Sequence, residues 1–123
     1  MPAYGKIALV TTLFHPSDVA FADGWSRRAP GIDGWRILVD RRDATQQVSV
    51  LPPGAEEPVF IITRPAVNVV VERRVRDGGD ERLEPVGEYP NLRVAVQALC
   101  PITDDDLQQI HEELEIAFPR NRR

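Results

Sequence analysis

The chain has 123 residues, a formal net charge of −4, 42% hydrophobic residues and 28% charged residues. These values are typical of an ordinary globular protein, so we expect residues 1–123 to form a single domain. The net negative charge argues against a global attraction to nucleic acid or to an anionic membrane. Because Cys100 is the one cysteine, the sequence excludes an internal disulfide framework and a zinc site built from several cysteines.

The N-terminal stretch KIALVTTLF, residues 6–14, is rich in apolar and β-branched residues and predicts a buried strand. It is too short and too polar for a membrane span and is a poor secretory signal, so we expect a soluble, cytoplasmic protein. A short helix should follow. Pro16 suits a first helical turn, Ser17 is a good cap, and Gly24 can end the helix.

Both tryptophans follow Asp-Gly, but the two triplets predict different structures. In the first, Gly24 would stand just after the helix, which leaves Trp25 in an Arg-rich loop and partly exposed. In the second, a turn leads into a strand over residues 35–40 whose apolar face begins at Trp35. We therefore predict that Trp35 belongs to the core and that Trp25 is the better candidate for contact with a ligand or partner.

The middle of the chain predicts short strands joined by turns. The clearest turn is RDGGDE, because Gly78 and Gly79 can adopt positive φ at little cost. Pro85 indicates that the strand after this turn lies at a sheet edge, since proline cannot donate to a strand ladder. The expected strands of this region are 35–40, 46–51, 59–64, 67–75 and 82–89.

Residues 91–100 fit two structures. Alternate positions from Leu92 to Ala98 are apolar, as in a strand, while an apolar helical stripe from Leu92 to Leu99 fits equally well. We favour the strand, because the segment contains two β-branched valines and a short connection to a following helix suits a strand.

The C-terminal region predicts an amphipathic helix over residues 104–118. Thr103 can cap it, and the three aspartates that follow face the positive end of the helix dipole. This position accounts for the aspartates without a cation, so we predict no metal site. Pro119 ends the helix and leaves residues 119–123 as a frayed tail. The fold class is therefore α+β: a mostly antiparallel sheet of about six or seven strands, a short helix after the first strand and this C-terminal helix.

The chain contains no complete catalytic or cofactor-binding motif, but two places carry reactive side chains. His15 and Ser17 follow the first expected strand, a junction where α/β folds often place sites. His111 lies at the edge of the apolar stripe of the last helix, and Glu115 one turn later could share a proton or a ligand with it. A surface histidine, a helix cap and an exposed ion pair explain the same residues without a function. Cys100 is interpreted as a small buried residue.

Paired arginines are the other candidates for binding. On a strand, Arg73 and Arg74 point to opposite faces, so one of them must occupy a face that otherwise packs valine. That conflict indicates an edge strand, a twisted strand end, a barrel lumen or a partner interface. The candidate binding residues are Trp25, Arg27, Arg28, Arg73 and Arg74.

The sequence thus favours a small non-enzymatic interaction or regulatory domain that acts through protein–protein contacts, with a homodimer as one form. The alternative is a small-molecule-binding domain or minimal enzyme with a pocket near His15 and His111. We expect no cofactor, no membrane contact and no nucleic-acid partner, because the chain is acidic and lacks an aromatic RNA-binding motif.

Overall fold

The computed structural model describes residues 13–30 and 34–119. Five strands form one antiparallel sheet in the order β1-β2-β3-β4-β5. The fold is α+β, as predicted, but the described sheet has fewer strands than expected. Residues 1–12 of the chain, which hold most of the expected first strand, lie outside the described part. The elements in chain order are α1 (Pro16–Arg28), β1 (Arg36–Arg42), β2 (Thr45–Leu51), β3 (Phe60–Thr63), β4 (Val69–Asp77), β5 (Asp80–Tyr89), α2 (Leu92–Leu99) and α3 (Asp104–Ala117).

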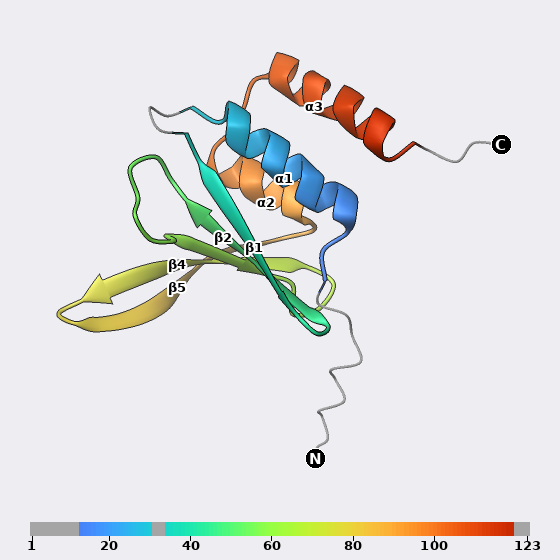
Figure 1. The fold of residues 1–123 in the computed structure, drawn as a ribbon. Coiled ribbons are helices and arrows are strands. Elements are labelled where there is room, and N and C mark those ends of the chain that lie inside the picture. The colour runs from blue at the N-terminus through green and yellow to red at the C-terminus, as the bar shows by residue number, and fades with distance from the viewer. Residues whose placement is uncertain (1–12, 31–33, 120–123) are drawn as a thin grey trace.

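The helices gather on one face of the sheet (Figure 1). α1 contacts β1, and α2 contacts β4 and β5, whereas α3 packs on α1 (Figure 1). The core lies between the sheet and the first two helices. It includes Val48, Val50 and Ile62 from the sheet and Phe21 and Trp25 from α1. Because side chains alternate along a strand, this core accounts for the apolar Val48 and Val50 of β2, while Ser49 and Leu51 on the other face are also buried.

Tight turns connect two of the strand pairs, β1 to β2 and β4 to β5. Gly78 and Gly79 adopt φ values of 60° and 95° between β4 and β5, which confirms the hairpin predicted from RDGGDE. Between β1 and β2 the turn is shorter than predicted, with Asp43 at φ 53°. Aspartate tolerates this left-handed conformation, so both strands extend further toward the turn than the sequence suggested.

Helix α1 corrects two predictions. Its cap is His15, whose side chain accepts the Ser17 backbone N–H, so Ser17 is a residue of the first turn and not the cap. Gly24 does not end the helix, which continues through Arg28. A Cβ atom at Gly24 would lie 3.3 Å from Cγ1 of Ile110, so the missing side chain allows α1 and α3 to pack closely. Gly24, which in the local sequence resembles a helix-ending glycine, therefore allows close packing of two helices.

This longer helix also reverses the prediction for the tryptophans. Trp25 is 0% exposed, and its Nε1 donates to the Cys100 carbonyl at 2.7 Å. Trp35 is only partly buried, and its Nε1 donates to the Pro30 carbonyl at 2.8 Å. The ring centroids lie 5.2 Å apart, so Trp35 covers Trp25 from outside. Trp25 is the core residue, and the expectation that it would be the exposed one was wrong.

Within residues 91–100, the predicted strand is instead helix α2 (Leu92–Leu99). The Asn91 side chain caps the helix by accepting the Val94 N–H at 3.0 Å. Ala95 and Val96 are buried, while Val94 is 41% exposed, which is the pattern of the helical stripe. Packing of this stripe against α1 and the sheet outweighs the weak strand preference of two valines.

The C-terminal helix is confirmed, with bounds close to the predicted ones. Thr103 caps it, since its hydroxyl accepts the Asp106 N–H at 3.1 Å. Ile110 and Leu114 of the apolar stripe are buried. Most of the predicted tail, residues 120–123, lies outside the described part of the chain. None of the helices in the described part is long and apolar enough to cross a membrane.

Candidate functional site

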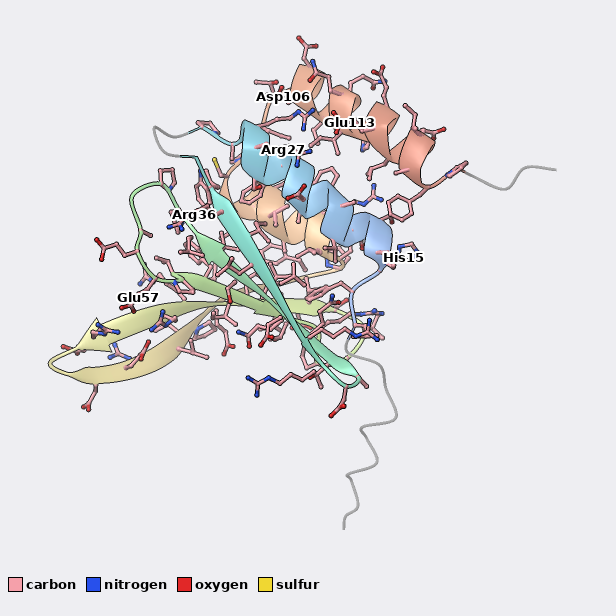
Figure 2. The ribbon with its side chains drawn as sticks, viewed as in Figure 1. His15, Arg27, Arg36, Glu57, Asp106 and Glu113 are labelled. Carbon is pink, nitrogen blue, oxygen red and sulfur yellow. The ribbon has the colours of Figure 1, made fainter. Side chains whose placement is uncertain are left out.

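A cleft opens between the start of α1, the first turn of α2 and the C-terminal half of α3, with a volume of about 550 Å³. Figure 2 shows His15 at the N-terminal end of α1, on the side where α3 ends. All of the weak catalytic candidates of the sequence line this one cleft, so the fold brings together residues from opposite ends of the chain. The lining residues are His15, Ser17, Arg93, His111, Leu114, Glu115, Phe118 and Pro119.

His15 and Ser17 form a local pair at one end of the cleft. His15 Nδ1 accepts the Ser17 N–H at 3.1 Å and lies 2.8 Å from Ser17 Oγ. A neutral imidazole whose Nδ1 accepts a hydrogen bond carries its own hydrogen on Nε2. The contact caps α1, and the hydroxyl–imidazole geometry is also the one that activates a serine nucleophile. The backbone hydrogen bond assigns the pair a capping role first.

Arg93 is the lining residue that sequence reasoning missed. Its Nε donates to Asp18 Oδ1 at 2.7 Å and its Nη2 to Ser17 Oγ at 3.3 Å, which ties α2 to the first turn of α1. Its guanidinium carbon lies 5.3 Å from the ring centroid of Phe21, a cation–π distance. The signal that could have found it was the Asn91 cap, because a helix from residue 92 directs Arg93 toward α1.

His111 enters the cleft from α3. Its ring centroid lies 6.2 Å from that of Phe21, the same buried ring on which Arg93 rests. The Phe21 ring thus contacts both basic side chains at the cleft wall. Glu115 follows one helical turn after His111 on the same side of α3.

The other predicted binding residues do not form one exposed surface. Trp25 is fully buried, whereas Arg27 is exposed and forms an ion pair with Asp23 on its own helix. Arg28 donates to Glu113 of α3 at 2.7 Å and to the Gly24 carbonyl at 3.0 Å (Figure 2 shows Glu113 on α3 above α1). Arg28 therefore fastens α3 to α1, and these residues do not make the Trp–Arg binding patch that the sequence suggested.

Arg73 and Arg74 also bind carboxylates of their own chain. Arg73 donates to Glu84 Oε1 at 3.0 Å, and this hydrogen bond is the main reason that the pKa of Glu84 is lowered. Arg74 forms an ion pair with Glu81 and donates to the Pro58 carbonyl at 2.8 Å. Since both guanidinium groups already have acidic partners, they offer little free positive charge to an anion.

The two edge strands of the sheet differ in how they are protected. β5 carries Pro85, and its pairing with β4 is interrupted by an irregularity between Val71 and Glu72. Proline and bulges are two of the devices that keep sheet edges from recruiting other strands, and charged side chains, which both β1 and β5 carry, are another. β1 has neither a proline nor a bulge and pairs with β2 through all seven of its residues in unbroken register. Within residues 13–30 and 34–119, no strand pairs with the outer edge of β1.

Neither a metal site nor a similar known protein indicates a function for the described part of the chain. In the part of the chain that the structure describes, no group of three or more His, Cys, Asp or Glu side chains could hold a metal ion. Burial raises the pKa of the Cys100 thiol, which disfavours the reactive thiolate. A scan against protein-family models, a search of curated proteins and a search of solved structures each give no match.

Proposed function

We propose that this chain is a non-enzymatic interaction domain whose binding surface is the outer edge of β1. The observation that carries this proposal is the contrast between the two sheet edges in residues 13–30 and 34–119: β5 carries Pro85 and a bulge, whereas β1 has no proline and pairs with β2 in unbroken register. An open edge presents backbone N–H and C=O groups that an added strand can bind. Leu38 is 55% and Val39 43% exposed, and they project from opposite faces of β1. A partner strand would cover both.

Two matched lysine substitutions test the proposal. Leu38→Lys places a charge on β1, and Leu83→Lys places the same charge on β5, where Leu83 is 47% exposed. Because both leucines are half exposed, both variants should fold, as circular dichroism and a urea titration would check. The tagged chain is expressed with a differently tagged second copy, and the proteins retained after mild crosslinking are compared.

The expected result is that Leu38→Lys loses its crosslinked partners while Leu83→Lys keeps them. Equal retention by both variants and the unmodified chain would refute a role for the β1 edge. Equal loss in both variants would also count against it, because the effect would then follow added charge and not the strand.

A second function is supported by the cleft. His15, His111 and Arg93 meet there beside an apolar wall that includes Leu114 and Phe118. Although Arg93 already pairs with Asp18 and Glu115 also lines the cleft, the N–H donors of the two histidines next to apolar surface suit a small acceptor with an apolar body, such as an aromatic carboxylate. This is the small-molecule interpretation of the chain, and the same cleft would be the site of a minimal enzyme.

Nuclear magnetic resonance with benzoate and phenyl phosphate as probes tests this second function. Saturable shifts of amides around the cleft are expected, and His111→Gln should weaken them. Arg27→Gln is the control, because Arg27 is an exposed arginine away from the cleft lining. Shifts that are absent, or that respond equally to both substitutions, would exclude binding of these anions in the cleft.

A further inference from the structure

We propose that the partner of the β1 edge is a second copy of this chain, paired antiparallel to the first about a two-fold axis that passes at Leu38. This inference rests on the proposed function and names its partner and register. It follows from the charge pattern of β1, which is complementary to itself in one register only.

The side chains of β1 divide between two faces. Ile37 and Val39 lie opposite Val50 and Val48, whose side chains are fully buried beneath the helices. Leu38 lies opposite Ser49, on the other face. By the strand alternation, Arg36 and Asp40 share that second face with Leu38. The helix-free face of β1 therefore presents Arg36, Leu38, Asp40 and Arg42 in that order.

A two-fold axis between antiparallel strands passes midway between one residue and its own symmetry mate. Centred on Leu38, it places Arg36 opposite Asp40 of the second copy, and Asp40 opposite Arg36 of the second copy. The two Leu38 side chains meet, and Ile37 meets Val39 of the second copy. The paired segment of each strand runs from Arg36 to Asp40, with opposite charges at both ends and apolar contacts between them.

The neighbouring two-fold registers that pair as much of β1 or more bring like charges together. Centring on Val39 places Arg36 opposite Arg42 of the second copy. Centring on Asp40 places the two Asp40 carboxylates opposite each other. Like charges directly opposite on a sheet destabilise the pairing. The charges of β1 thus disfavour these two registers while they permit the one centred on Leu38.

The present contacts of these charges leave them available for this pairing. Arg36 donates one Nη2 hydrogen bond to the Ala55 carbonyl at 2.6 Å, and a guanidinium has five N–H donors (Figure 2 shows Arg36 at the start of β1). Asp40 has an ion-pair contact with Arg42 at 3.9 Å, close to the limit of such a contact, and its side chain is 62% exposed. Exchange of this partner for Arg36 of the second copy therefore costs little.

Charge reversal at the two positions provides the test, followed by sedimentation velocity of the purified chain up to millimolar concentration. Arg36→Asp alone places two carboxylates opposite each other at both ends of the paired segment, and Asp40→Arg alone places two guanidinium groups opposite each other there. Each variant should dimerise about tenfold more weakly than the unmodified chain. In a heterodimer of the two variants, every carboxylate of one chain faces a guanidinium of the other at both ends of the paired segment. A mixture of the two variants should therefore form a heterodimer. Arg82→Asp on β5 is the control and should not change dimerisation.

The outcomes separate the register from the proposed function. A dimer that Leu38→Lys weakens but that charge reversal and mixing leave unchanged would overturn the register and keep the β1 edge. A chain that stays monomeric at every concentration would overturn the second copy as partner, while the crosslinking comparison of Leu38→Lys and Leu83→Lys still decides the proposed function. A dimer insensitive to every β1 substitution would overturn both.

Discussion

Replacement of Trp25 by alanine should cost far more stability than replacement of Trp35. Trp25 of α1 is fully buried in the core, so Trp25→Ala leaves a large cavity. We expect this change to lower the free energy of unfolding by about 3–5 kcal/mol. The substitution also removes the Nε1 donor from the Cys100 carbonyl, a hydrogen bond worth about 1 kcal/mol and included in that range. Since a domain of this size is stable by about 5–15 kcal/mol, the loss is a large fraction of the total.

Trp35→Ala is the matched control. Trp35 is only partly buried, so its removal leaves an open groove and should cost about 1–2 kcal/mol. Because the rings lie 5.2 Å apart, the double variant should lose less than the sum of the single losses, with a coupling of about 0.5–1.5 kcal/mol. Urea unfolding followed by far-ultraviolet circular dichroism gives all the values. A Trp25→Ala loss no greater than that of Trp35→Ala would refute this view of the core.

Three further predictions concern single contacts. Arg73→Gln should raise the pKa of Glu84 toward its ordinary value in a carbon-13 titration, and any stability that this pair adds should disappear as pH falls through the lowered pKa of Glu84. Cys100 should react with iodoacetamide more slowly in the folded chain than in urea at equal pH, because burial raises its thiol pKa. Gly24→Leu should destabilise the chain by about 1–3 kcal/mol in urea unfolding, because the new side chain would press on Ile110; an unchanged midpoint would show that α1 and α3 are not closely packed.

Local signals that depend on short-range chemistry could be recognised in the sequence. The Thr103 cap, the Gly78-Gly79 turn and the edge position of Pro85 each follow from one or two residues and their immediate backbone. The length of α1 could not be predicted in this way. Gly24 is tolerated inside that helix because Ile110, far along the chain, packs against its open backbone.

The candidate cleft shows the same division. His15 and His111 were identified from the sequence, since histidines stand out by residue type and by position on an element. Arg93 was missed because it lay in a segment assigned to a strand, and a strand would not have directed it at Asp18. The Asn91 cap was the available signal, but it was outweighed by the two valines, one of which, Val94, is exposed on the helix.

The two Asp-Gly-Trp triplets explain why local sequence patterns failed at the tryptophans. Gly34 adopts φ 74°, as a turn glycine does, and Trp35 leads into β1. Gly24 stands in the same local sequence but inside a helix, because α3 supplies a packing partner there. The Trp35 ring of the second triplet packs against the Trp25 ring of the first, with 5.2 Å between the ring centroids. The same three residues end a turn in one place and continue a helix in the other because the chain around them differs. β1 begins at Arg36, directly after Trp35, so the tryptophan pair lies at the start of the strand whose edge we propose as the binding surface.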